Sequence, residues 1–310
     1  VEADVRLEGG AIGRAIAPAG ASRGSREAIE LRDGGTRFGG HDVLGAIDNV
    51  NKPIAQALRG RDALDQGGAD AALIALDGTD DKSKLGGNAT VAVSLAVAQA
   101  AAAASGLALW QYLANGAPVS LPMPQIQVFG GGAHAGRRID IQDLMVMPVG
   151  AWTFSDAIAI TAEIHRCAGL LMQEAGKSGG VADEGGWWPD FSSNEEALEM
   201  LVRAIERAGL RPGTDAAIAL DIAASEFGHD GRYTFALDNR TLDRDALAEL
   251  LLHWVERYPV LSIEDPFAED DRVAWIAFAR AAPARLQIVG DDYLVTRAAL
   301  SSEERRVGKE

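Results

Sequence analysis

The segment VLSIEDP, at residues 260–266, joins a short apolar run to two acids and a proline. Two other segments share this plan: AAIALD at 216–221 and LQIVGDD at 286–292. Short, continuously apolar runs are typical of strands buried on both faces of a parallel sheet. Helical patterns at 243–257 and 271–281 separate the three strands. The sequence therefore predicts an α/β fold with a parallel sheet covered by helices on both sides.

Each of these three strands ends in acid. The acids are, in chain order, Asp221, Glu264 with Asp265, and Asp291 with Asp292. In an α/β barrel the C-terminal ends of the strands converge on one mouth, so these carboxylates should meet. Carboxylates without a His/Cys cluster favour a hard cation, for which Mg²⁺ fits best and Mn²⁺ is also suitable. A single acid after a strand is commonly a helix cap or a turn residue. Three such strand ends favour a metal site instead.

The chain before residue 118 has a different pattern. Alternation with period two predicts strands at 1–7 and 28–33. Helical patterns follow near residues 42–58, 62–75, 88–105 and 107–113. Strands followed by helices predict an α+β domain, which we place at residues 1–117. Three prolines within 118–124 favour extended chain, so we place the boundary there and the second domain at 118–310.

The composition limits the partners of the protein. The 310 residues are 47% hydrophobic and 24% charged, with a formal net charge of −16. A chain this acidic repels phosphate backbones and anionic lipid, so we expect neither nucleic acid nor a membrane surface as its main partner. The apolar run at 91–104 is mostly alanine and too short to span a bilayer, which predicts a buried helix. The single cysteine, Cys167, cannot form an internal disulfide, which fits a reducing compartment.

Longer motifs give the chain a family resemblance. Around the three strand ends stand LDIAASEF at 220–227, SIEDP at 262–266 and VGDD at 289–292. These motifs closely resemble the metal-ligand segments of the enolases, and the resemblance covers almost the whole chain. Further motifs that support it are GAS at 20–22 with ELRD at 30–33, LDGT at 76–79 with KSKLG at 82–86, and DEGG at 183–186.

The resemblance implies a fold and a reaction. The fold is an α+β N-terminal domain followed by an enolase-type (β/α)8 barrel, here incomplete at its C-terminal end. The reaction is the Mg²⁺-dependent, reversible dehydration of 2-phosphoglycerate to phosphoenolpyruvate, a step of glycolysis in the cytoplasm. The full-length enzyme is expected to be a homodimer without a membrane span. Enolases are also displayed at cell surfaces, although no feature of this sequence indicates a particular ligand there.

The resemblance also implies the metal ligands. Asp221, Glu264 and Asp291 are similar to the ligands of the tightly held Mg²⁺. Ser22, in a Gly-rich loop, resembles the residue that closes over the substrate and helps to hold a second Mg²⁺. From spacing alone Ser22 would be interpreted as a turn residue.

Three further residues resemble catalytic groups. Glu184 is similar to the general acid that protonates the departing hydroxyl, and Asp143 stands where the family has a glutamate paired with that acid. His134 resembles a histidine of the substrate loop. Without the resemblance, Glu184 would be part of a polar turn and His134 a structural residue.

The chain departs from the family in its lysines. A lysine or histidine base beside Mg²⁺ is a known property of the enolase superfamily, and in enolases it is a lysine on the barrel strand after the Asp291 strand. The lysines here occupy none of the matching barrel positions; they are Lys52, Lys82, Lys84, Lys177 and Lys309. Residues 301–310 do not resemble the family continuation, and residues 1–7 begin like the middle of a strand. We therefore expect an enolase chain truncated at both ends, unstable alone and inactive.

Other departures lie near the expected site. Asp143 is one methylene shorter than glutamate, and residues 127–132 lack the usual asparagines. Arg23 replaces a threonine, and Trp188 of the pair at 187–188 replaces a smaller residue. These changes leave two alternatives open. One is a paralogue that dehydrates a related phosphonate or phosphorylated acid, and the other is a non-catalytic enolase-like binding protein.

Overall fold

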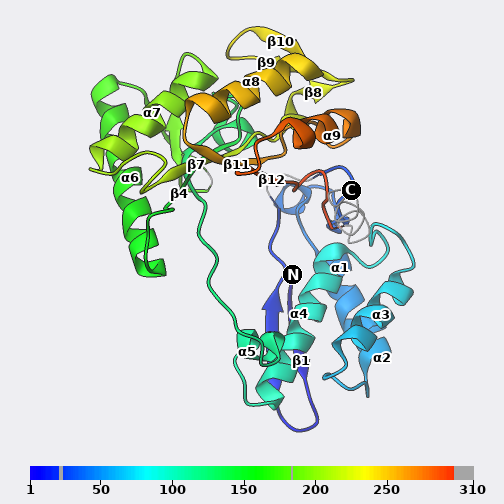
Figure 1. Ribbon diagram of the computed structural model, residues 1–310. Helices are drawn as coiled ribbons and strands as arrows, with labels where there is room; N and C mark the ends of the chain where they lie inside the picture. Colours follow the sequence, from blue (N-terminus) through cyan, green and yellow to red (C-terminus); the bar gives the residue numbers. More distant parts are fainter. Residues whose placement is uncertain (21–23, 183, 297–310) are drawn as a thin grey trace. The chain divides into compact units, whose positions relative to one another are not determined.

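The computed structural model describes residues 1–20, 24–182 and 184–296 (Figure 1). The chain divides into two compact units. Unit 1 contains the described residues of Val1–Ala21 and Arg26–Ser120, and unit 2 those of Ser22–Ser25 and Leu121–Glu310. The main division, between residues 120 and 121, lies within the proline-rich segment.

Unit 1 is a two-stranded hairpin packed against helices. β1 and β2 are antiparallel, and both contact α4, the long helix beside the hairpin in Figure 1. Alanines and valines of α4 supply five of the twelve buried residues in the core of this unit. The elements are β1 (Glu2–Arg6), β2 (Ile12–Ile16), a 3₁₀ turn (Arg37–Gly40), α1 (Leu44–Asn49), a π-helical turn (Val50–Ile54), α2 (Ala55–Leu58), α3 (Gln66–Asp77), α4 (Gly87–Ala104) and α5 (Leu109–Ala114).

The prediction of a strand at 28–33 was wrong. The partner of β1 is β2, and residues 28–33 form no strand. Their backbone groups bind loop atoms instead: Ile29 N–H donates to Asp81 O, and both backbone groups of Leu31 bond to the side chain of Asn88. Because these partners supply the hydrogen bonds, alternating apolar residues do not need a neighbouring strand here.

Helix α4 is the buried helix that the alanine-rich run predicts. By length and composition it could cross a membrane, but 67% of it is buried inside the unit. The hairpin approaches it closely at Gly13, where an added Cβ would overlap the backbone of Ala96 and Ala100. A glycine at this position therefore permits β2 to lie directly on the helix.

Unit 2 is built on a seven-stranded sheet in the order β12-β11-β7-β4-β3-β6-β5. β11 (Val260–Glu264) pairs in parallel with β7 (Ala217–Asp221) and β12 (Gln287–Val289), as the apolar runs predict. Within the described residues the sheet is open, with β12 and β5 at its edges, which is consistent with an incomplete barrel.

β4 (Asp143–Met147), for which the apolar runs predicted no direction, departs from the parallel arrangement. This strand runs antiparallel to both β3 (Ile126–Gly130) and β7. The connection from β3 to β4, residues 131–142, contains a single 3₁₀ turn and no α-helix. A parallel pair requires a longer crossover, usually helical, so this short connection dictates the antiparallel direction.

Helices pack around this sheet. α6 contacts β3 and β5, α7 contacts β4, and α8 contacts β11, while α6 and α7 also contact each other. Ser193 caps α7 by accepting from Glu196 N–H. The remaining elements are α6 (Phe154–Ala175), β5 (Ser178–Val181), β6 (Trp187–Pro189), α7 (Asn194–Arg207), β8 (Gly228–His229), β9 (Arg232–Phe235), β10 (Arg240–Asp243), α8 (Arg244–Arg257), α9 (Arg272–Ala281) and 3₁₀ turns at Gly132–Ala135 and Ala224–Glu226.

The substitution Gly13→Ala should destabilise unit 1. The new methyl group would push β2 away from α4, and overpacking of this kind costs about 1–3 kcal/mol. The measurement is urea unfolding followed by circular dichroism. Gly9→Ala is the matched control, because no heavy atom lies within 4 Å of a Cβ built at Gly9. Equal unfolding midpoints for the two variants would contradict the close packing.

Candidate metal centre and acid pair

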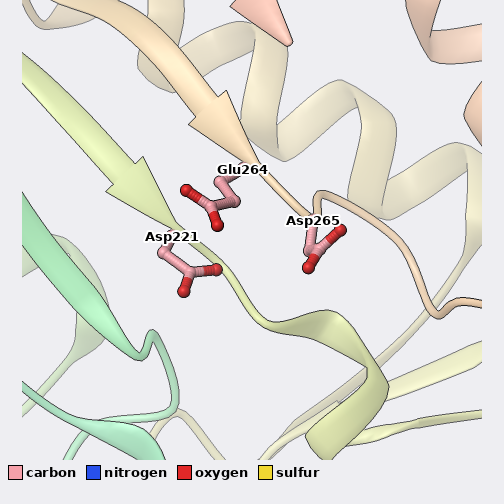
Figure 2. A group of neighbouring side chains, drawn as sticks. All are labelled: Asp221, Glu264 and Asp265. Atoms are coloured by element: carbon pink, nitrogen blue, oxygen red, sulfur yellow. The ribbon is translucent and has the colours of Figure 1, made fainter. Parts of the chain in front are cut away.

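Two carboxylates face each other at the C-terminal ends of neighbouring strands. Asp221 ends β7 and Glu264 ends β11, and these residues are direct partners in the parallel pairing. Asp265 follows Glu264 on the turn after β11 (Figure 2). One carboxylate oxygen from each of the three residues lies within 4.8 Å of the others. The strand ends therefore do bring acids together, as the sequence predicts.

Asp143 joins this edge of the sheet because β4 is antiparallel. Its position at the start of β4 is level with Asp221 at the end of β7, and the two residues are partners in the ladder. Had β4 been parallel, its first residue would lie at the opposite edge. The direction of this one strand thus places a predicted acid-pair residue beside the predicted metal ligands.

Asp221 is buried and held by two donors. It is 7% exposed, and its carboxylate accepts hydrogen bonds from Ala223 N–H and from Nε2 of Gln142, each at 2.9 Å. Burial raises the pKa of Asp221 well above its usual value, and the charges of Glu264 and Asp143 raise it further.

Glu264 is also partly buried among negative charges. Burial, together with the charges of Asp265 and Asp291, raises the pKa of Glu264 to about 7. No lysine or arginine in the described part of the chain forms an ion pair with Glu264, Asp221 or Asp143. Crowded, partly buried carboxylates without a cationic side chain are a donor set that suits a hard divalent cation, so the residues fit Mg²⁺.

The other two predicted metal ligands, Asp291 and Ser22, are not part of the cluster of carboxylate oxygens found among the described residues. The charge of Asp291 acts on Glu264, and its backbone N–H donates to Asp265 Oδ1 at 3.1 Å, but it is not one of the three residues whose oxygens cluster. Ser22 and the neighbouring Arg23 lie outside the described residues. The assignment of Asp221, Glu264, Asp291 and Ser22 as ligands remains a prediction.

The three residues predicted as catalytic lie together beside this edge. Glu184 lies on the turn between β5 and β6, where its side chain is 48% exposed, and Nε2 of the buried His134 is 3.8 Å from Glu184 Oε1. Asp143 is buried, and burial together with the Glu184 charge raises the pKa of Asp143 to about 6, against the lowering effect of the Gln127 hydrogen bond. The group combines one accessible carboxylate with one shielded carboxylate.

Gln127 on β3 connects the two carboxylates. Its Nε2 donates to Asp143 Oδ1 and, at 3.2 Å, to Glu184 Oε2. Its Oε1 accepts from Gly186 N–H at 2.8 Å, which fixes the orientation of the amide. A Cβ at Gly186 would collide with this side chain, so the glycine leaves the space that Gln127 occupies.

The sequence interpretation missed three residues of this site. The motifs indicate no role for Gln127 or Gln142, and they group Asp265 with the strand-end acids without predicting its bonds to the backbone. The available signal was position: Gln127 and Gln142 lie on the two segments that carry His134 and Asp143. The distances that make them partners of Glu184 and Asp221 depend on strand register, which the sequence does not display.

Comparison with known families agrees with both units. The model of the enolase N-terminal domain matches residues 1–113, and the model of the enolase C-terminal TIM barrel domain matches residues 118–305.

The metal-free protein should lose stability as pH rises from about 5 to 8. The pKa of Glu264 is about 7 in the folded state against an ordinary value of 4.5, and the pKa of Asp143 is shifted in the same direction. The folded state therefore binds more protons than the unfolded state in this range, and this stabilisation is lost as pH passes the folded pKa values. The measurement is the thermal unfolding midpoint in EDTA.

The variant Glu264→Gln, which carries no titratable group at this position, should show a smaller fall over the same pH range. Addition of Mg²⁺ at pH about 8 should raise the midpoint of the unsubstituted protein, because a cation that binds only the folded state stabilises it. A midpoint in EDTA that rises over this range would contradict the carboxylate cluster as described.

Proposed function

The chain belongs to the enolase family, and on this premise we propose that this lyase acts on 2-phosphoglycerate and phosphoenolpyruvate in cytoplasmic glycolysis. The observation that carries the proposal is the carboxylate edge of the sheet. Asp221 and Glu264 meet there, with the Asp143–Gln127–Glu184 group on the neighbouring strands. Removal of a proton beside a carboxylate requires positive charge to stabilise the negative charge that forms, which a metal held by the first group would supply. Loss of hydroxide requires a general acid, which the second group contains.

Asp221, Glu264 and Asp291 are the proposed ligands of the tightly held Mg²⁺. When bound, this ion supplies positive charge next to the substrate carboxylate as negative charge develops there. The protein contributes the orientation of the ligands: Gln142 and Ala223 hold the Asp221 carboxylate by hydrogen bonds, and β-sheet pairing holds Glu264 level with it. Such donors to ligating side chains maintain metal affinity.

Glu184 is the proposed general acid. Its partly exposed carboxylate can reach a substrate hydroxyl, and protonation of the hydroxyl makes the leaving group water rather than hydroxide. Gln127 holds the Glu184 carboxylate beside the buried Asp143 by donating a hydrogen bond to each of them. His134, buried next to Glu184, would orient the substrate.

Asp143 is linked to Glu184 although its side chain is shorter than the glutamate found in the family. Gln127 reaches both carboxylates, so Asp143 stays connected to Glu184 in spite of the missing methylene. This connection supports the enolase reaction over a paralogue with a changed substrate.

The proposal assigns no base to the described residues. Lys177 forms an ion pair with Glu196 at 2.8 Å, and Lys52, Lys82 and Lys84 belong to unit 1 and match no base position of the family. Lys309 lies outside the described residues. We therefore propose that the 310 residues bind the cation but do not complete the reaction.

The proposal predicts Mg²⁺ binding without turnover. Isothermal titration should show a Mg²⁺ site in the unsubstituted chain, and Asp221→Asn should weaken it at least about 100-fold, because loss of a ligand exceeds the effect of losing a hydrogen-bonded supporting residue. Asp230→Asn is the control, since this exposed aspartate lies on the turn between β8 and β9.

Turnover is measured by the ultraviolet absorbance of phosphoenolpyruvate formed from 2-phosphoglycerate. Equal Mg²⁺ affinity in the Asp221→Asn variant would overturn the metal assignment. Formation of phosphoenolpyruvate by these 310 residues would overturn the proposal that they lack a base, while leaving the lyase assignment intact.

A further inference from the structure

Asp265 uses its carboxylate to bind the backbone after β12. Asp291 N–H donates to Oδ1 at 3.1 Å and Asp292 N–H donates to Oδ2 at 2.7 Å, with a longer contact of 3.5 Å from Tyr293 N–H. Asp265 is 2% exposed, so water cannot hydrogen-bond to its carboxylate, and these backbone amides supply the hydrogen bonds instead. Hydrogen bonds from N–H groups to a charged acceptor are among the stronger ones in proteins.

The backbone of Asp265 connects the neighbouring strand ends as well. Its N–H donates to Val289 O at 3.0 Å, and its carbonyl oxygen accepts from Ala224 N–H at 3.1 Å. One residue therefore bonds to the segment that follows β7 and to both the last residue of β12 and the turn beyond it.

Asp265 adopts a costly backbone conformation to do this. Its φ is 40°, in the left-handed region that favours glycine, and a proline follows it. Residues before proline prefer extended conformations, so this geometry is disfavoured twice. Conformations of this kind persist where surrounding bonds over-determine them.

The turn that Asp265 holds is the one that carries Asp291. Val295 N–H closes this turn by donating to Asp291 O at 2.7 Å, and the ring of Tyr293 stacks on Trp275 of α9 at 4.4 Å. The side chain of Asp291 can be directed only from a fixed backbone, and the two Asp265 oxygens supply the fixing bonds at its own N–H and the next. Removing them would free the turn at the position where a ligand must be held.

We propose that Asp265 is a positioning residue that fixes Asp291 for the metal, and is not itself a ligand. This inference rests on the proposed function, in which Asp291 is a ligand. The competing arrangement is that Asp265 completes the site with Asp221 and Glu264, since their oxygens lie within 4.8 Å of one another. The amide bonds favour positioning, because a carboxylate turned toward the metal would release Asp291 and Asp292 N–H groups.

The decisive experiment is a double-mutant cycle on the full chain, with Mn²⁺ as the probe. Asp265→Asn should lower Mn²⁺ affinity about 10–100-fold, the range found when a residue supporting a metal ligand is lost. Asp291→Asn should lower it at least as much. The double variant should bind like Asp291→Asn alone, because a residue that acts only through Asp291 has no effect once that carboxylate is gone.

Amide hydrogen exchange in the metal-free protein gives an independent measurement. Asp265→Asn should speed exchange at residues 291 and 292 by about tenfold or more, since a charged acceptor is lost. Asp291→Asn should leave residue 292 protected. Asp270→Asn, a change at an exposed aspartate in the same segment, is the matched control and should alter neither exchange nor Mn²⁺ affinity.

Additive losses in the cycle would overturn the inference and indicate that Asp265 contributes to the metal site independently of Asp291. Normal Mn²⁺ affinity in Asp291→Asn would also overturn it, because Asp291 would then not be a ligand. Unchanged exchange at 291 and 292 in Asp265→Asn would overturn it as well. If Asp265→Asn does not fold, Asp291→Asn still decides, because the inference requires it to lose Mn²⁺ while keeping the amide at 292 protected. Failure of the unsubstituted chain to bind Mn²⁺ would instead overturn the proposed function, and the exchange measurement is independent of that outcome.

Discussion

The mutual repulsion of carboxylates at one edge of the sheet is the constraint around which unit 2 is organised. Asp143, Asp221 and Glu264 are brought level by pairing between β4, β7 and β11. Burial and proximity raise the pKa of each of them. Like charges in a poorly hydrated position are tolerated only with compensation, which protonation, neutral hydrogen-bond donors or a bound cation can supply.

Neutral donors do much of this work. Gln142 and Ala223 N–H bond to Asp221, Gln127 bonds to Asp143 and Glu184, and backbone amides bond to Asp265. An amide stabilises a carboxylate without supplying a full positive charge, which keeps the negative potential available for a bound cation. A lysine or arginine in the same places would neutralise the site and compete with the metal. The choice of glutamines and backbone N–H groups is therefore consistent with metal binding.

Sequence patterns predicted some elements well and others poorly, for identifiable reasons. The apolar runs ending in Asp221 and Glu264 became neighbouring parallel strands, and the alanine-rich run became the buried helix α4. The segment 28–33 alternates like a strand but bonds to loops and to Asn88, which no local pattern could reveal. The direction of β4 follows from its short connection to β3, and the apolar runs of the other strands carry no information about it.

The sequence by itself determined the family, the two-domain arrangement of motifs and the acids that follow the central strands, because these depend on residue types and their order along the chain. Tertiary structure alone decided which side chains meet. It placed Asp143 opposite Asp221, set Gln127 between Asp143 and Glu184, and turned the Asp265 carboxylate toward the backbone at 291 and 292. The physical reason is that strand direction and register fix distances across the sheet, and residues far apart in the sequence contain no record of those distances.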